Sequence, residues 1–326
     1  MSNNILSVDS LKTHFFQERG VVKAVDGVSL QIEKGSVLGL VGESGCGKTV
    51  TAMSIMRLIQ QPGRIISGKV MFGGKDLVSM GDDELRRVRG GQISMVFQDP
   101  GAALNPSFTV GQQIEETFII HQKANKKEAK EKAVEIMELV GIPSARDRLK
   151  SYPHQLSGGM QQRVMIAIAL SCHPSLLIAD EPTTNLDVTI QAQILNLMKQ
   201  MGKEFNSAIL LITHDLGVVA QMCDKVAVMY AGKIVELADS DELFYNPLHP
   251  YTIALLQCIP RRQKGAAKLK VIKGQVPDLM NPPSGCNFHP RCPKVMSVCS
   301  KAEPALMEVK PGHFVACYLY GESSNE

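Results

Sequence analysis

The sequence has no long hydrophobic run, no charge excess of either sign and no recognisable export signal. None of its 326 residues lies in an uninterrupted apolar stretch of roughly 18, the length that a membrane-spanning helix needs. Lys and Arg number 35 against 32 Asp and Glu, a formal net charge of +3, which does not by itself indicate nucleic-acid binding. The first residues lack the basic and apolar regions of a secretory signal, so we expect the cytosol, where the eight cysteines stay reduced.

A phosphate-binding loop is the strongest pattern near the N-terminus. The apolar run at residues 37–41 is followed by GESGCGKT and then by a helical pattern, which is the strand–loop–helix setting of a P-loop. We expect Lys48 to reach the β- and γ-phosphates of ATP and Thr49 to ligate Mg²⁺. Cys46 lies between a helix N-terminus and Lys48, which predicts a lowered thiol pKa. The expected nucleotide-binding residues here are Gly42, Ser44, Gly45, Cys46, Gly47, Lys48 and Thr49.

A second apolar strand, LLIA at residues 176–179, ends in two adjacent carboxylates. Asp180 is expected to hold Mg²⁺ through water, and Glu181 to polarise the water that attacks the γ-phosphate. The alternative is a surface acidic pair that opens a turn before Pro182. The apolar residues ahead of the pair favour the buried strand.

Between these two elements the segment LSGGMQQR departs from generic P-loop proteins and resembles the signature of ATP-binding-cassette (ABC) ATPases. Ser157, Gly158 and Gly159 begin an apolar helix whose N-terminus is aimed at an anion, the alternative being a helix cap without a ligand. The resemblance implies that these residues bind the nucleotide held by a second cassette. Two ATP molecules would then lie between two subunits arranged head to tail.

The remaining motifs of that family follow in order. The resemblance implies that Gln98 senses Mg²⁺ and contacts the membrane partner, that Asp187 belongs to the D-loop, and that His214 contacts the γ-phosphate. Phe15 lies at the family's position for an aromatic that stacks on adenine, with Phe16 as the alternative. The implied catalytic residues are Glu181, His214 and Gln98.

The implied fold is α/β, with a P-loop, RecA-like core, an antiparallel β subdomain, an inserted helical subdomain and a small C-terminal extension. We expect the nucleotide-binding core at residues 1–97 and 163–243. The helical subdomain with the signature is expected at 98–162, where apolar residues recur at helical spacing and Gly141 provides a stop. Residues 244–326 are expected to form the extension.

The C-terminal segment points to one branch of the family. HPYT, followed by GCNFHPRCP and VAC, resembles the extension of ATPase subunits from dipeptide and oligopeptide permeases, in the peptide/nickel branch, and the whole chain resembles the D-type subunit. The resemblance implies a heterodimer with a paralogous F-type ATPase subunit, two transmembrane permease subunits and an extracytoplasmic substrate-binding protein. It also implies a place on the cytoplasmic face of the membrane and no nucleic-acid partner.

Four cysteines gather in this segment, at Cys286, Cys292, Cys299 and Cys317. Their spacing lacks the C-x2-C pairs of structural zinc and the C-x2-C-x2-C run of bacterial ferredoxins, so spacing alone leaves the ligand open. Four reduced thiols on a polar, proline-rich segment favour a shared metal that holds the segment together. The resemblance implies a [4Fe–4S] cluster, with Zn²⁺ and no metal as the alternatives.

Together these patterns predict an ATPase subunit that powers import of dipeptides or oligopeptides, in which ATP binding closes a cassette dimer and hydrolysis reopens it. An importer ATPase for nickel or glutathione is one alternative. A soluble ABC ATPase of DNA repair or translation is another, although the chain shows neither a second cassette nor a long coiled-coil insertion. In a third, the cysteine segment acts as a redox or metal sensor on the transporter.

Overall fold

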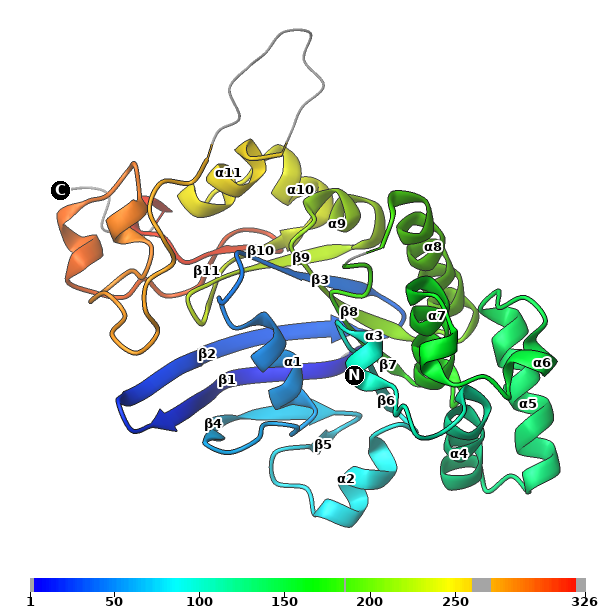
Figure 1. The fold of residues 1–326 in the computed structure, drawn as a ribbon. Coiled ribbons are helices and arrows are strands. Elements are labelled where there is room, and N and C mark those ends of the chain that lie inside the picture. Colours follow the sequence, from blue (N-terminus) through cyan, green and yellow to red (C-terminus); the bar gives the residue numbers. More distant parts are fainter. Residues whose placement is uncertain (1–2, 185, 260–270, 321–326) are drawn as a thin grey trace, which may run out of the picture. The chain divides into compact units, whose positions relative to one another are not determined.

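The computed structural model describes residues 3–184, 186–259 and 271–320, so parts of the expected extension, at 260–270 and 321–326, lie outside the described residues. Figure 1 draws these residues as a ribbon, and the chain divides into two units. The first unit comprises Met1–Ile5, Ile32–Ser36 and Ser79–Ile212. The second unit comprises Leu6–Gln31, Val37–Val78 and Thr213–Glu326.

Parallel strands form the centre of the first unit. They are β6 (Ile93–Val96), β7 (Leu176–Asp180) and β8 (Ala208–Thr213), the last residue of which is assigned to the second unit. β7 pairs in parallel with β6 on one side and with β8 on the other. All residues of the three strands are buried, as expected for parallel strands covered on both faces. Their carboxyl ends therefore share one edge of this sheet.

Helices make up most of the rest of the first unit. The N-terminal ends of two helices have a clear sequence signal, since Thr109 and Asn125 each form a capping box with the residue three positions later. The helices are α2 (Asp82–Val88), α3 (Pro100–Ala103), α4 (Val110–Gln122), α5 (Lys126–Leu139), α6 (Ala145–Arg148), α7 (Gly158–Leu170) and α8 (Val188–Glu204), with a 3₁₀ turn at Pro153–Gln155.

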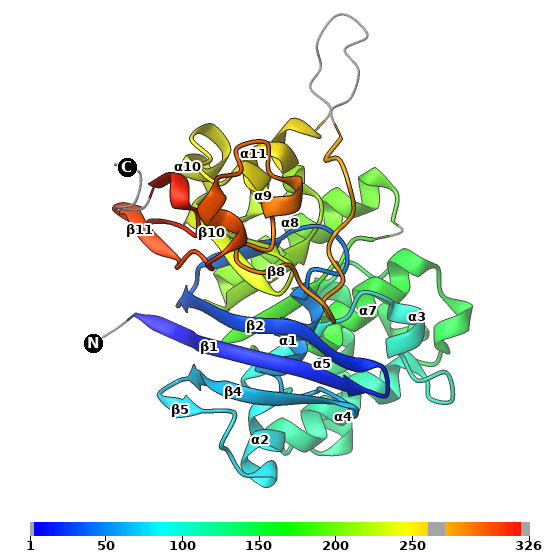
Figure 2. The same ribbon diagram turned by 90° about the vertical axis from the view of Figure 1, so that its left-hand side faces the viewer.

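The second unit contains an antiparallel sheet in the order β2-β1-β4-β5 (Figure 2). Its strands are β1 (Asn4–Gln17), β2 (Gly20–Glu33), β4 (Gly63–Phe72) and β5 (Lys75–Asp76). A second set of strands includes β3 (Val37–Val41), which leads into the phosphate loop. β3 runs parallel to β9 (Lys225–Tyr230), and β9 is antiparallel to β10 (Lys233–Asp239).

The C-terminal segment continues this second set of strands. β12 (His313–Val315) pairs with β10 and with β11 (Met307–Lys310), so this part of the C-terminal segment belongs to the sheet. The helices of this unit are α1 (Lys48–Ile55), α9 (Leu216–Met222), α10 (Ser240–Tyr245) and α11 (Pro250–Gln257), with 3₁₀ turns at His289–Arg291, Ser297–Ser300 and Tyr318–Tyr320. Over the described ranges, every helix is too short or too polar to cross a bilayer.

Candidate functional site

The glycine-rich loop lies between β3 and α1, and close packing requires glycine at two of its positions. Gly42 has φ +154°, and a Cβ there would lie 2.2 Å from the carbonyl oxygen of Met229. Gly47, which caps α1, has φ +106°, and a Cβ there would lie 2.1 Å from the carbonyl oxygen of Ala24. Any other residue at either position would clash with backbone, so the loop keeps its narrow turn only with glycine.

Lys48, the first residue of α1, holds the loop through hydrogen bonds. Its Nζ donates to the carbonyl oxygen of Gly42 at 2.8 Å and to that of Glu43 at 3.0 Å, and the side chain is buried. Ser44 and Thr49, in contrast, reach the surface. A buried ammonium, a helix N-terminus and surface hydroxyls thus lie together in one short turn, an arrangement suited to a phosphate chain and its cation.

Cys46 contradicts the expectation of a reactive thiol. The residue has no exposed surface, and burial raises its pKa because it penalises the thiolate, an effect that outweighs the nearby charge of Lys48. The prediction of a lowered pKa was wrong because neighbours in the sequence do not show how deeply a side chain is buried.

In the first unit the structure brings Gln98 and Glu181 together. The amide nitrogen of Gln98 donates to Oε2 of Glu181 at 3.1 Å, and the hydroxyl of Thr184 donates to the same oxygen at 3.0 Å. The backbone of Glu181 has φ +44°, and its N–H donates to the carbonyl oxygen of Ile212 at 2.9 Å, which fixes the turn after β7. Asp180, one residue earlier, is 2% exposed. Sequence reasoning missed Thr184, whose only signal is its place three residues after Glu181.

The signature residues lie at the start of α7. The Ser157 hydroxyl accepts from the N–H of Met160 at 3.4 Å, and a Cβ on Gly158 would have no heavy atom within 4 Å. Gln161 holds the preceding turn by donating to the carbonyl oxygen of Pro153 at 2.8 Å. Ser157 and Gly158 are exposed, while Gly159 is half-buried, so the N-terminus of this helix opens to solvent within its own unit.

Three further expected residues occupy defined local positions. Asp187 caps α8 by accepting from the N–H of Ile190 at 2.9 Å, and His214 directly follows β8. Phe15, on β1, packs its ring against the backbone of Gly63. The ring of Phe16 is covered by the guanidinium of Arg64, 4.0 Å from the ring centroid.

The expected metal centre on the C-terminal cysteines was wrong. Among residues 3–184, 186–259 and 271–320, no group of three or more His, Cys, Asp or Glu side chains is placed to hold a metal ion. The four cysteines line a cavity of only about 10 Å³, roughly the space of one water. Burial raises the thiol pKa values of Cys286, Cys292 and Cys317, that of Cys317 to about 11, so these three thiols are protonated near neutral pH in the segment as it stands. Within the described residues, Cys286, Cys292, Cys299 and Cys317 therefore form neither the expected [4Fe–4S] site nor the alternative Zn²⁺ site.

Two family models match the chain. The model described as ABC transporter matches residues 25–184, and the model described as oligopeptide/dipeptide transporter, C-terminal region, matches residues 235–299. Neither describes an iron–sulfur protein, in agreement with the correction above.

Whole-chain relatives are transport proteins. Oligopeptide transport ATP-binding protein AppD of Bacillus subtilis is 52% identical over 99% of this chain and 99% of its own. Oligopeptide transport ATP-binding protein OppD of Salmonella typhimurium is 48% identical over 97% of this chain and 94% of its own. Dipeptide transport ATP-binding protein DppD of Escherichia coli is 46% identical over 96% of each chain.

Solved structures show the same fold. The ATP-binding cassette MJ0796, in a dimeric post-hydrolysis state bound to ADP and Pi, matches with a TM-score of 0.65 at 26% identity, over 72% of this chain and 98% of its own. The cassette cbiO1 from Clostridium perfringens, part of the transporter complex cbiONQ, matches with a TM-score of 0.63 at 29% identity, over 75% of this chain and 92% of its own.

Fold and loop geometry together define an ABC-type ATPase, an α/β enzyme that binds and hydrolyses ATP. Within that class, the chain belongs to the family of ATP-binding proteins of oligopeptide and dipeptide ABC transporters. The expected fold class and enzyme class are thereby confirmed.

Proposed function

We propose that this chain hydrolyses ATP to drive import of dipeptides or oligopeptides through a membrane permease. The observation that carries the proposal is similarity along the whole chain, including the C-terminal region, to ATP-binding proteins named for oligopeptide and dipeptide transport. An ATPase of DNA repair or translation has no such support. The proposal places the chain on the cytoplasmic face of the membrane, working with two permease subunits and an extracytoplasmic substrate-binding protein.

The proposed phosphate site is the loop from Gly42 to Thr49. Its buried ammonium and surface hydroxyls support this role, because they supply a cation for phosphate oxygens and oxygen ligands of the kind that Mg²⁺ prefers. Bound Mg²⁺ would neutralise charge on the transferred phosphoryl group. The residues proposed to contact the nucleotide phosphates or Mg²⁺ from this loop are Gly42, Ser44, Gly45, Cys46, Gly47, Lys48 and Thr49.

Glu181 is the proposed base. Its Oε2 accepts from two donors, which orient the carboxylate, and we assign the carboxylate to polarising the attacking water. We assign Gln98 to orienting this carboxylate and to Mg²⁺, Asp180 to Mg²⁺ through water, and His214 to the γ-phosphate. Phe15 is proposed to stack on adenine, since Arg64 already covers the ring of Phe16.

The proposed working unit is a pair of cassettes. Exposed Ser157 and Gly158, with Gly159 and the D-loop residue Asp187, would contact a nucleotide held by another subunit. MJ0796, a cassette of similar fold, has been solved as a dimer, which supports a paired arrangement here. We propose a paralogous F-type ATPase subunit as the partner. We also propose the domain boundaries given above, with the helical subdomain beginning at residue 98, the core resuming at 163 and the C-terminal extension beginning at 244.

Uptake measurements test the cargo. In a strain that lacks this chain, labelled dipeptide and oligopeptide uptake should be lost, and the wild-type chain should restore it while Glu181→Gln should not. Nickel and glutathione uptake, measured in the same cells, should be unaffected. Loss of nickel or glutathione uptake with normal peptide uptake would overturn the cargo assignment and leave the ATPase assignment standing.

A further inference from the structure

Arg291, in the C-terminal segment, reaches back to the phosphate loop. Its two terminal nitrogens donate to the two carboxylate oxygens of Glu43, at 2.7 and 3.0 Å. The Arg291 side chain is 5% exposed and that of Glu43 27%. A paired, largely buried contact of this geometry is among the strongest that two side chains make. Because Glu43 directly follows Gly42, the contact falls on the first turn of the loop.

The guanidinium of Arg291 is held in place by its other donors. Nε donates to the carbonyl oxygen of Lys273 at 2.9 Å, and the terminal nitrogens donate to the hydroxyl of Tyr230 at 3.2 Å and to the carbonyl oxygen of Gly274 at 3.3 Å. Hydrogen bonding to Glu43 is the main cause that raises the pKa of Arg291 above its ordinary value. The side chain is therefore oriented before any ligand binds, which is what a positioning residue requires.

Glu43 has a second partner in the same C-terminal segment. Its backbone N–H donates to the hydroxyl of Tyr251 at 2.8 Å, and Tyr251 is completely buried. The carbonyl oxygen of Glu43 accepts from Lys48, as described above. The backbone N–H, the backbone carbonyl and the carboxylate of Glu43 are thus all hydrogen-bonded. Two of the three partners, Tyr251 and Arg291, lie after residue 243, where the sequence predicts that the nucleotide-binding core ends.

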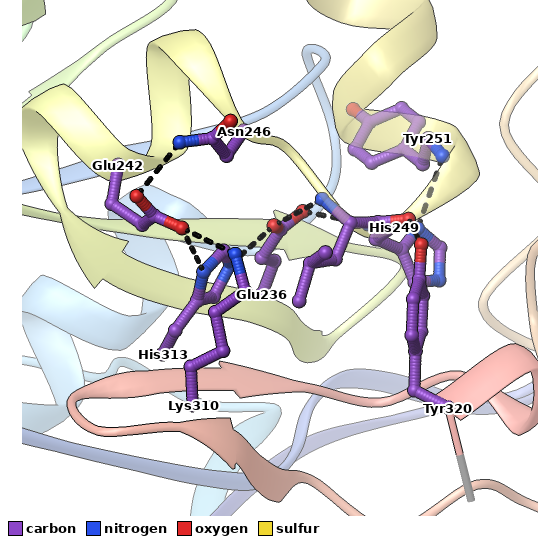
Figure 3. Close-up of polar contacts among 9 residues, drawn as sticks. Glu236, Glu242, Asn246, His249, Tyr251, Lys310, His313 and Tyr320 are labelled. Atoms are coloured by element: carbon purple, nitrogen blue, oxygen red, sulfur yellow. Dashed lines mark hydrogen bonds and ion pairs between the residues drawn. The ribbon is translucent and has the colours of Figure 1, made fainter.

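A buried polar cluster anchors the helix that carries Tyr251 (Figure 3). Glu236 on β10 has no exposed surface and accepts three hydrogen bonds, from the N–H of Leu248 at 2.7 Å, from the N–H of His249 at 2.9 Å and from Nε2 of His313 at 2.8 Å. Nδ1 of His249 then accepts from the N–H of Tyr251 at 3.0 Å. One carboxylate therefore joins β12 to the two residues that precede α11, and this holds Tyr251 in place beside the loop.

We propose that Arg291 is a positioning residue for the ATP site, acting through Glu43. It does so in two ways. It fixes the backbone of the first turn of the loop, and it neutralises a carboxylate that would otherwise repel the phosphates. The inference rests on the proposed function, in that the loop from Gly42 to Thr49 must hold those phosphates. The segment FHPRCP lies outside the ATPase motifs. Through Arg291, it contributes directly to nucleotide affinity.

Titration of the purified full-length chain with a fluorescent ATP analogue tests the proposal. Arg291→Ala should weaken binding about tenfold, which corresponds to about 1.4 kcal/mol. Arg291→Met, which keeps the apolar stem, should have the same effect and serves if the alanine variant does not fold. Arg291→Lys should lie between these variants and the wild type, because it keeps the charge and loses the paired geometry.

Rescue separates this role from a general loss of structure. Adding Glu43→Gln to Arg291→Met should recover part of the lost affinity, because it removes the carboxylate left unpaired beside the phosphates. A merely structural arginine would show no such recovery. Arg146→Ala is the matched control: it removes a paired contact with Glu131, on the surface of the first unit, and should leave ATP affinity unchanged.

The outcomes are distinct. Weakened binding with rescue supports the proposal. Folded Arg291→Ala or Arg291→Met that binds the analogue as tightly as the wild type overturns it and leaves the proposed function intact. Failure of the wild-type chain itself to bind the analogue would instead overturn the assignment of the loop, and the inference with it.

Discussion

The side-chain amide of Gln98 donates to the carboxylate of Glu181 at 3.1 Å, although 83 positions separate the two residues. Each follows the carboxyl end of a strand, and the two strands, β6 and β7, are parallel neighbours. Because the ends of parallel strands meet at one edge, sheet pairing alone brings the amide to the carboxylate. The pair is therefore expected to respond to mutation as one unit.

Glu181→Gln should preserve ATP binding and lower turnover by about 10²–10⁴-fold, because the amide keeps the shape of the side chain and loses the charge that polarises water. Phosphate release and nucleotide titration on the same preparation measure the two effects separately. Glu135→Gln, an exposed position on α5, is the control and should behave as the wild type. Hydrolysis by Glu181→Gln near the wild-type rate would show that another group is the base.

Lys48→Ala should weaken ATP binding by about 1.5–3 kcal/mol, the range for hydrogen bonds that involve a charged group. The loss has two origins, because Lys48 supplies a cation for the phosphates and also holds two carbonyl groups of the loop. Equilibrium titration measures the affinity, with Lys69→Ala, at an exposed position of β4, as control. An unchanged dissociation constant for Lys48→Ala would contradict the phosphate role.

Cys46 should react slowly with alkylating agents in the folded protein. Its thiol is buried and its pKa is raised, so little thiolate forms near neutral pH, and the labelling rate should increase as pH rises. Mass spectrometry of labelled peptides, with and without denaturant, measures the difference. Rapid labelling of Cys46 in native protein at neutral pH would show that the loop opens in solution.

The ion pair that joins β11 to α10 should make stability depend on acid pH. Lys310 donates to Glu242 at 2.8 Å, and this contact, with one from Asn246, lowers the pKa of Glu242 from 4.5 to about 2 (Figure 3). A carboxylate whose pKa is lowered in the folded state stabilises the fold fully at pH values above its unfolded-state pKa. That stabilisation is lost as the pH falls toward 2. The stability difference between wild type and Glu242→Gln should therefore shrink between pH 4.5 and 2.

Urea unfolding at several pH values measures that difference. Asp241→Asn, at the exposed neighbouring position, is the control and should show no comparable trend. A difference between wild type and Glu242→Gln that stays constant as the pH is lowered would show that the pair does not form in solution.

The isolated chain should be largely monomeric and a weak ATPase, because Ser157 and its neighbours are proposed to complete a site on another cassette. Specific activity should rise with protein concentration or on adding the proposed F-type partner. Ser157→Arg should remove that rise without affecting ATP binding by the chain's own loop. Light scattering combined with an activity assay tests this, and concentration-independent turnover by a monomer would contradict the two-cassette proposal.

Elements with local signals could be predicted from the amino-acid sequence. The loop from Gly42 to Thr49 was predicted from its motif between an apolar strand and a helix, and close backbone contacts at Gly42 and Gly47 account for two of its glycines. The helix at Lys126–Leu139 was predicted from its apolar spacing, and a capping box at Asn125 accounts for its start. The strand at residues 176–179 was predicted from an apolar run that ends at two carboxylates, and β7 spans Leu176–Asp180. Family membership was also evident from these patterns, since order and spacing carry it.

Properties that depend on burial depth and on contacts between distant segments could not be predicted from the sequence. Sequence neighbours indicated an activated thiol at Cys46, whereas burial raises its pKa. Clustered cysteines indicated a metal, whereas the folded segment leaves a cavity of about 10 Å³ between them. The pairing of Glu43 with Arg291 spans 248 positions and had no local signal at all. Each of these depends on which atoms exclude water around a group, and that is established only when remote parts of the chain pack together.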